Sequence, residues 1–280
     1  MNEAVGSTTI ASATVGAGLF SSPWRHRELL VALVKREVLG RYRGSAMGML
    51  WSLLNPIFML VVYTFVFGLV FKTRWPGGSG SRSEFVLLLF AGLLVFNVFS
   101  ECVLRAPRLI VDNANYVKKV VFPLEILPWV TLGGVLFHLL ASVSVWMVFH
   151  LVLVGAPHLT AVLLPLVLLP LILVTLGVSW TLAALGTYLR DIQQMVGVFV
   201  SALMFLSAIF YPVTALPENY QALLRLNPLT LVVEQARDVL FWGVVPDIAT
   251  WSIGLAASMV IAWLGFAWFQ KARNGFADVL

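Results

Sequence analysis

The chain has 280 residues, of which 60% are hydrophobic and only 11% are charged, and its formal net charge is +5. A soluble domain contains about 25% charged residues, whereas the mean hydropathy of this chain is +0.94. The composition therefore excludes a soluble globular protein and predicts a polytopic membrane protein.

The first 47 residues are the only long polar part of the chain. Residues 1–22 are small, polar and nearly uncharged, without the basic and apolar regions of a cleaved signal peptide, and they predict a disordered tail. Residues 23–43, PWRHRELLVALVKREVLGRYR, mix charged residues with leucine and valine. This pattern predicts an amphipathic helix in the membrane interface, which either only anchors the topology or also faces a partner.

Six apolar segments follow, each long enough to cross the hydrocarbon core, which takes about 20 residues in a helix. They lie near 48–71, 84–104, 124–154, 160–188, 194–212 and 248–269. The segments are continuous rather than alternating, so an all-α fold is predicted and the strands of a membrane barrel are excluded. With six spans, one side holds thirteen Lys and Arg residues and the other five. The positive-inside rule then predicts both termini in the cytoplasm, and the basic charge needs no nucleic-acid partner.

Two predicted cytoplasmic connections carry polar residues suited to a partner. The segment 105–122 is too polar for burial in lipid and is either a docking element or a solvated linker. The segment 188–194 places Arg190 beside Asp191. These two residues either pair with each other or contact a partner, and their spacing leaves both interpretations open.

The predicted outer segment at 212–247 is neither a plain loop nor a span. Prolines interrupt it, and its apolar runs are too short to cross the bilayer. We expect two short amphipathic helices that meet at Asn227 and Pro228 and form a re-entrant segment in the outer leaflet, buried in protein or lining a cavity. Glu234 and Arg237 are then expected near the outer interface, as a local polar cluster or as ligand contacts.

Aromatic residues form stripes on two of the predicted spans. In the first span three of them recur every seven residues and share one helical face. In the fifth span two share a face and a tyrosine closes the outer end. Most membrane aromatics are packing or interface residues; the alternative is a conduit wall on which sugar rings stack. The conduit candidates are Trp51, Phe58, Phe65, Phe199, Phe210 and Tyr211.

The chain has no energy-converting or catalytic motif of its own. The P-loop pattern GxxxxGK[ST] is absent, as are metal-binding motifs and a nucleophile elbow. The single cysteine, Cys102, excludes an internal disulfide. If the protein is a pump, another polypeptide binds ATP and Mg²⁺, and this chain needs no cofactor.

Four stretches together carry a family resemblance. They are RYRGSAMGMLWSLLNP at 41–56, VKKVVFPLEILP at 117–128, LRDIQQMVGVFVSALMFLSAIFYPVTALPENY at 189–220 and LNPLTLVVEQARDVLFWG at 226–243. In this order they resemble the permease subunits of type-2 ABC exporters of polysaccharide and polyol phosphate, the Wzm, KpsM and TagG type. The resemblance implies a homodimer of six-span permeases in the bacterial cytoplasmic membrane. It also implies two copies of a separate P-loop ATPase and a lipid-linked glycan substrate.

The resemblance further implies roles for individual segments. It makes 23–43 the interface helix facing the ATPase and 212–247 the outer gate, with candidates Asn227, Pro228, Glu234 and Arg237. The two cytoplasmic connections become coupling elements, with candidates Asp112, Asn113, Tyr116, Arg190 and Asp191. The lipid diphosphate is expected near Arg41, Tyr42 and Arg43 or near the basic loop 105–119, and the conduit between the first and fifth spans.

Other classes compete with this interpretation. A permease of a drug or small-lipid exporter would share the fold. A membrane glycosyltransferase or acyltransferase would need acidic or histidine clusters around one cavity, whereas this chain has scattered single residues. A scaffold protein would not need a re-entrant outer segment. Whether the product is O antigen, capsule or teichoic acid is left open by the sequence.

Overall fold

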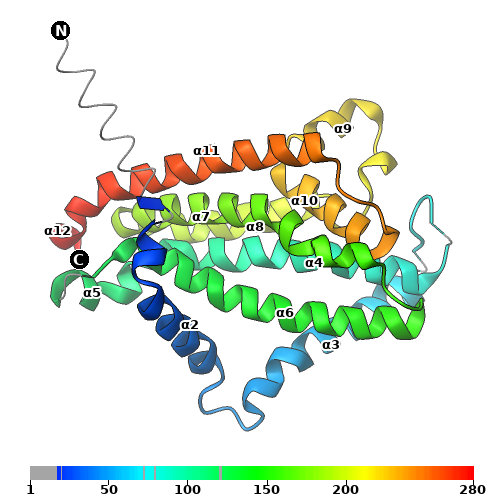
Figure 1. Cartoon of the computed structure of the whole chain (residues 1–280), viewed down its shortest axis with the longest axis horizontal. Helices are drawn as coiled ribbons and strands as arrows, with labels where there is room; N and C mark the ends of the chain where they lie inside the picture. The colour runs from blue at the N-terminus through cyan, green and yellow to red at the C-terminus, as the bar shows by residue number, and fades with distance from the viewer. Residues whose placement is uncertain (1–17, 20, 72, 79, 120–121) are drawn as a thin grey trace.

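The computed structural model describes residues 18–19, 21–71, 73–78, 80–119 and 122–280, and these residues form helices and loops without any strand. Long helices form one bundle, with shorter helices at its ends (Figure 1). The longer helices are α2 (Arg27–Tyr42), α3 (Trp51–Tyr63), α4 (Arg82–Arg105), α6 (Leu127–Leu153), α7 (Leu164–Tyr188), α8 (Ile192–Leu206) and α11 (Ile248–Ala272). The short helices are α5 (Ala114–Lys119), α9 (Glu218–Arg225), α10 (Pro228–Arg237) and α12 (Phe276–Val279). The all-helical prediction is confirmed for this part of the chain.

Five helical stretches in the described residues are long and apolar enough to cross a membrane. They are Gly48–Val70, Arg82–Arg108, Leu124–Leu153, Leu159–Tyr188 and Ile248–Val279, and they coincide with five of the six predicted spans. The remaining predicted span, 194–212, corresponds to α8, which has only 15 residues. At 1.5 Å per residue α8 is about 22 Å long, shorter than the hydrocarbon core of about 30 Å. The chain is thus a multi-pass membrane protein, and its sixth crossing stays a prediction.

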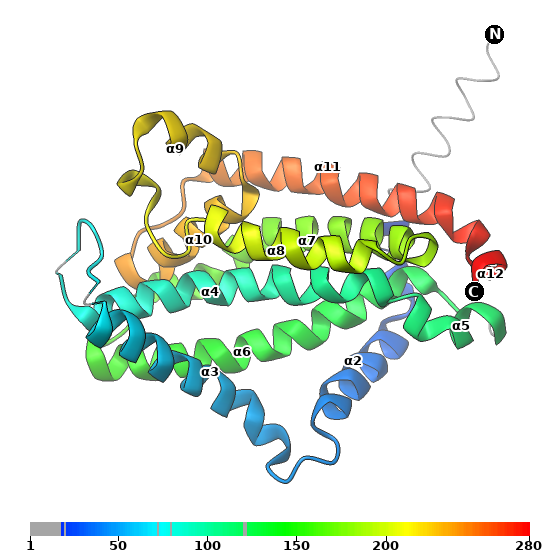
Figure 2. The ribbon, with the colours of Figure 1, turned by 180° about the vertical axis from the view of Figure 1, so that it is seen from behind.

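Helix α4 is the buried centre of the bundle. In its most apolar stretch 83% of the residues are buried, against 17% in the stretch that contains α3. Apolar residues occur all round α4, and a helix of this kind is stable only when it is covered on all sides. It packs against α6, α7, α8 and α10, while α3 leans away from the bundle beside it (Figure 2).

Helices α7 and α11 cross so closely that their backbones touch. A Cβ atom at Gly177 would lie 2.6 Å from the carbonyl oxygen of Ile261, and one at Gly265 would lie 2.1 Å from that of Gly177. Small residues at such crossings allow dispersion contacts between backbones in a membrane.

The start of α11 is capped by Asp247. Its carboxylate accepts hydrogen bonds from the Thr250 backbone N–H and from the Thr250 hydroxyl, and these bonds lower the pKa of Asp247.

The predicted tail and interface helix differ in part from the structure. Residues 1–17 and 20 of the tail lie outside the described residues, but Leu19 is helical and buried. The interface helix is α2, which begins at Arg27; residues 21–25 before it are also helical, and a turn at His26 divides the predicted helix 23–43 into two. Its apolar residues point to two sides, because Leu33 is buried while Val31 is exposed. Helix α2 therefore lacks a single apolar face.

The outer segment contains the two expected short helices, α9 and α10, which meet at Asn227 and Pro228. The Asn227 side chain accepts a hydrogen bond from the Leu229 backbone N–H at 3.0 Å, as an N-cap residue does. Helix α9 lies at the end of the bundle opposite to α5 and α12 (Figures 1 and 2), whereas α10 returns along α4.

Candidate functional site

A polar cavity of about 270 Å³ lies where α2, α3, α4 and α6 meet. In a chain with so few polar residues, a concentration of them in one cavity within the bundle is a candidate binding site. The residues with polar groups that line it are Arg41, Tyr42, Ser52, Asn55, Tyr63, Asn97, Ser100, Glu101, His138 and Ser142. Two of the three residues predicted for the lipid diphosphate, Arg41 and Tyr42, are therefore in this cavity. Arg43 is not among its lining residues.

Ion pairs join α2 to α4 at the edge of this cavity. Arg41 pairs with Glu101, and Glu37 pairs with Arg105. Arg105 Nη1 also lies 3.7 Å from Glu101 Oε1. The side chains are partly exposed, so each pair contributes at most about 1 kcal/mol to stability. Their main effect is geometric, because they fix the position of α2 along the C-terminal half of α4.

A hydrogen bond between Tyr42 and His138 joins α2 to α6 on the other side of the cavity. The Tyr42 hydroxyl oxygen lies 3.2 Å from His138 Nδ1, and the two rings meet edge to face. Burial raises the pKa of the Tyr42 phenol, so the hydroxyl stays protonated at neutral pH and is available as a donor. The end of α2 is thus attached to two helices of the bundle.

The predicted conduit residues of the first span lie on its exposed side, Trp51 and Phe58 in α3 and Phe65 in the π-helical turn Thr64–Val70 that continues it. Trp51, Phe58 and Phe65 are 38%, 71% and 59% exposed. The inner side is different, because Phe67 contacts Phe85 of α4 with ring centroids 5.8 Å apart. The aromatic stripe is therefore unpartnered within one copy of the chain, and whether it lines a conduit stays a prediction.

The predicted aromatic face of the fifth span is interrupted by the end of α8. Phe199 is 60% exposed on α8, but Phe210 lies beyond the last residue of that helix, Leu206. Phe210 contacts Phe205 and Phe67, with centroid distances of 5.4 and 6.1 Å. The helical spacing that placed Phe199 and Phe210 on one face was therefore wrong, because no continuous helix joins them.

The end of α8 is stabilised by side chains that donate hydrogen bonds to its last carbonyl groups. The last carbonyls of a helix have no partner within the helix, and inside a membrane each of them would be costly to leave unpaired. Here the donors are Ser207 Oγ to Leu203 O (2.6 Å), Tyr211 Oη to Phe205 O (2.6 Å) and Asn227 Nδ2 to Leu206 O (3.0 Å). These bonds explain why the helix ends before it reaches the length of a span.

Arg237 of α10 completes the same set of hydrogen bonds. It donates to the carbonyl oxygens of Ala208 at 2.8 Å and Ile209 at 2.5 Å, and its Nε donates to Leu88 of α4 at 3.0 Å. Its guanidinium lies 4.5 Å from the centre of the Trp75 ring, a distance at which cation and ring attract each other. Arg237 thus connects α10, α4, the end of α8 and the first outer loop.

The environment of Arg237 corrects the prediction of a polar cluster at the outer interface. Only 3% of Arg237 is exposed, and among the described residues it forms no ion pair. Glu234 instead accepts a hydrogen bond from the Val213 backbone N–H at 3.3 Å. Gly92 of α4 makes room for the guanidinium, because a Cβ there would lie 2.7 Å from Arg237 Nη2. Sequence reasoning missed this role because its partners are backbone carbonyls.

The first connection predicted to be cytoplasmic, 105–122, is folded in its described part and is not a solvated linker. Ile110 is fully buried, and the Tyr116 ring stacks on Phe122 with centroids 4.3 Å apart. The candidate Asp112 forms an exposed ion pair with Arg108 at 3.3 Å. The Asn113 side chain donates to the Leu109 carbonyl oxygen at 2.8 Å. Both line a hollow of about 330 Å³ that extends to Arg36 and Glu37 of α2.

The second connection exposes both of its candidates. Arg190 and Asp191 are exposed at the turn between α7 and α8. Within the described ranges they form no ion pair, with each other or with other residues, which removes the pairing alternative. Their charges are therefore free to contact another molecule.

Comparison with known proteins identifies the family. Residues 28–241 match the model of the ABC-2 type transporter family. The chain belongs to this family. It is 29% identical over 257 residues to the O-antigen export system permease protein RfbA of Myxococcus xanthus, covering 91% of this chain and 96% of that protein. It is 26% identical over 254 residues to the RfbA protein of Klebsiella pneumoniae, covering 90% and 95%. The polysialic acid transport protein KpsM of Escherichia coli is 26% identical over 250 residues, covering 87% and 93%.

We predict that Arg237→Met destabilises this ABC-2 chain by about 3 kcal/mol or more, because the carbonyl groups of Ala208 and Ile209, which lie beyond the end of α8, lose the donor that Arg237 supplies. Thermal unfolding of the purified protein measures the effect. Arg237→Lys should be more stable than Arg237→Met but less stable than the wild type. A lysine ammonium keeps the positive charge, but it lacks the several coplanar N–H donors of the guanidinium.

The matched control is Arg225→Met, which removes an exposed arginine from neighbouring α9. Surface substitutions of this kind change stability by no more than about 0.5 kcal/mol. Equal melting temperatures for Arg237→Met and Arg225→Met would contradict the role assigned to Arg237.

Proposed function

We propose that this chain is the membrane subunit of an ATP-driven exporter of lipid-linked polysaccharide, of the O-antigen type, in the bacterial cytoplasmic membrane. The observation that carries the proposal is similarity over nearly the whole chain to O-antigen export permeases of two organisms. Similarity to a polysialic acid transport protein keeps capsule polysaccharide as the second candidate cargo. Movement is from the cytoplasmic to the outer face, with both termini in the cytoplasm.

The working assembly in this proposal contains two copies of the chain and two copies of a P-loop ATPase, which binds the ATP and Mg²⁺. The chain itself holds no cofactor and no ATPase site. Support for a homodimer comes from α3 and α8, whose large apolar side chains, including Phe58 and Phe199, have no partner within one copy. Paired copies would bring these faces together around the polysaccharide.

The polar cavity is the proposed entry site for the lipid diphosphate and first sugar. The pair between Arg41 and Glu101 is partly exposed, so a diphosphate can replace the carboxylate as the partner of Arg41. Charge-assisted bonds of arginine to phosphate are strong and bidentate. Tyr42 and Asn55 add neutral hydrogen-bonding groups for sugar hydroxyls. The cavity thus supplies a cation for the head and neutral polar groups for the glycan.

Helix α2 is the proposed lever between the ATPase and the entry site. The ATPase would contact the exposed pair Arg190 and Asp191 and the folded 105–119 connection, where Asp112 and Asn113 line a hollow shared with α2. Because α2 is tied to α4 through Glu37 and Arg41, a displacement of α2 reaches the cavity directly. At the outer end, α9 and α10 form the proposed re-entrant gate around Asn227 and Pro228.

The decisive test is reconstitution with the partner ATPase. The chain and the ATPase encoded beside it should co-purify, and the complex in lipid nanodiscs should hydrolyse ATP faster when a lipid-linked polysaccharide is added. Stimulation by hydrophobic drugs or short lipids, with none by the polysaccharide, would replace the proposal with the drug or small-lipid exporter. Failure to associate with any P-loop ATPase would reject the exporter class.

We predict that Trp51→Ala and Phe58→Ala each slow polysaccharide export several-fold while the complex stays assembled. Each substitution removes an aromatic surface of the conduit, and stacking on one ring contributes about 1 kcal/mol. Export is measured as surface polysaccharide in cells and assembly by co-purification with the ATPase. The matched control is Trp268→Ala, an exposed tryptophan on α11. Normal surface polysaccharide in both α3 variants would refute the conduit role.

We predict that Glu101→Gln lowers export per ATP hydrolysed by up to about fivefold, because it removes the carboxylate that joins Arg41 and Arg105 and such pairs contribute up to about 1 kcal/mol. The ratio of exported polysaccharide to released phosphate measures the coupling. Glu28→Gln, an exposed carboxylate at the start of α2, should leave the ratio unchanged. An equal fall of this ratio in Glu28→Gln and Glu101→Gln would contradict the role of Glu101, because the loss of any negative charge would then have the same effect.

A further inference from the structure

A large apolar groove runs beside the contact of α2 with α6, and residues of α6, α7 and α11 form its other wall. Its volume is about 900 Å³, and Lys35 is its only charged lining residue. We call it the α2 groove. The lining includes Val31 and Leu39 of α2, Leu136 of α6, Leu173 of α7 and Met259 of α11. The two exposed α2 residues in this set are the apolar side chains that do not pack on the bundle.

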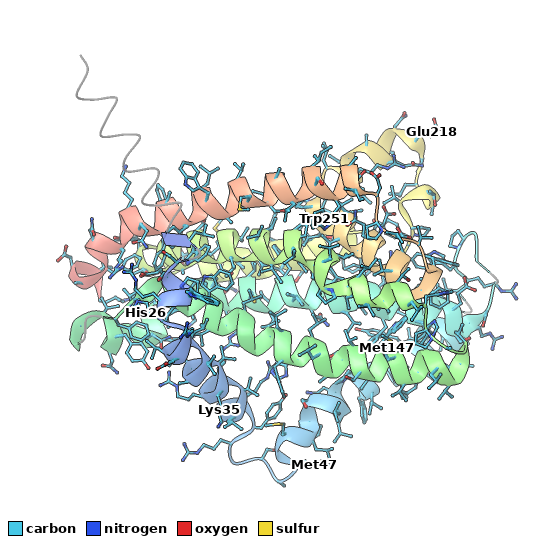
Figure 3. All side chains as sticks on the ribbon, in the orientation of Figure 1. His26, Lys35, Met47, Met147, Glu218 and Trp251 are labelled. Atoms are coloured by element: carbon cyan, nitrogen blue, oxygen red, sulfur yellow. The ribbon has the colours of Figure 1, made fainter. Side chains whose placement is uncertain are left out.

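A basic hollow continues the groove on the other side of α2. Its volume is about 510 Å³, and it is lined by Lys35, Arg36, Arg43, Leu39, Ala32 and Gly40. Lys35 and Leu39 belong to both the hollow and the groove. No carboxylate lines the hollow, and within the described parts of the chain neither Lys35 nor Arg43 forms an ion pair. Lys35 lies midway along α2, and Met47 is at the loop that follows it (Figure 3).

The apolar α2 groove adjoins a basic hollow whose charge is not neutralised by a carboxylate. This combination fits an amphiphile with an anionic head group. We propose that the α2 groove binds one anionic phospholipid of the bilayer, with an acyl chain along Leu136 and Met259 and its phosphate between Lys35 and Arg43. Apolar burial favours the chain, and Lys or Arg near the membrane surface attracts anionic headgroups.

The charge of the hollow decides against a second copy of this chain as the occupant. Two copies would bring Lys35 and Arg43 of each hollow against the same cations of the other, and unpaired like charges repel. A lipid phosphate instead neutralises them.

The position of the groove favours a bilayer lipid over the lipid carrier of the cargo. Helices α6 and α11, which form part of the groove wall, face the viewer in Figure 1, whereas α8 with the conduit candidate Phe199 faces the viewer in Figure 2. The groove thus lies on a different face of the chain from the α8 part of the proposed conduit, and Met49 at the start of the first span lines its edge. A lipid in the groove would fill the space beside the contact of α2 with α6 and so support the position of the lever.

The test measures lipid retention by the purified full-length chain. The protein in detergent is equilibrated with phosphatidylglycerol or with phosphatidylcholine, and native mass spectrometry counts the lipid bound to each chain. We expect one phosphatidylglycerol per chain to be retained about tenfold more strongly than phosphatidylcholine. Lys35→Gln combined with Arg43→Gln should abolish this preference.

A matched control removes two cations from the neighbouring segment, through Arg25→Gln and Arg27→Gln, and should keep the preference. Leu136→Trp, which fills the groove, should lower retention of both lipids. Three results would each overturn the proposal: no headgroup preference in the wild type, the same preference in the Lys35 and Arg43 double variant, or displacement of the bound lipid by equimolar polyprenyl phosphate. The last result would assign the groove to the cargo carrier.

Discussion

The need to pair backbone carbonyl groups inside a membrane constrains the outer half of this protein, and Arg237 meets that need. Its guanidinium binds carbonyl oxygens of Ala208, Ile209 and Leu88. These bonds allow α8 to end within the bundle instead of continuing as a full span, and Ala208 takes the left-handed conformation at this point, with φ of 51°. Unpaired carbonyls in hydrocarbon would each cost several kcal/mol. The break in α8 therefore depends on Ser207, Tyr211 and Asn227, which bind the carbonyls of its last turn, and on Arg237, which binds those of the two residues Ala208 and Ile209 beyond it.

Helix α4 connects this arrangement with α2 at the other end of the bundle. Near one end, Leu88 accepts a bond from Arg237; near the other, Glu101 and Arg105 hold α2. The helix is buried along most of its length, and it also packs against α8. The polar cavity lies beside this same helix, between α2 and the bundle.

Two exposed surfaces have different chemistry. The exposed side of the first span presents Trp51, Phe58 and Phe65, whose aromatic rings could stack with sugars or contact a second copy. The α2 groove is apolar and adjoins the basic hollow of Lys35 and Arg43. An aromatic surface and an apolar surface with a basic end are thus separate in one chain.

The sequence by itself determined the class, the helical fold and the position of five spans, because hydropathy over about 20 residues is a local property that a membrane selects for. It also located the turn at Asn227 and the polar character of the connection at 105–119. Tertiary structure alone decided where α8 ends, that Phe210 lies beyond that end, and that Arg237 is buried. Each of these depends on partners distant in the chain, such as Leu88 and Arg237, separated by 149 residues. The periodicity of apolar residues in a helix cannot show that a side chain distant in the sequence will donate hydrogen bonds to the carbonyl groups at the end of that helix.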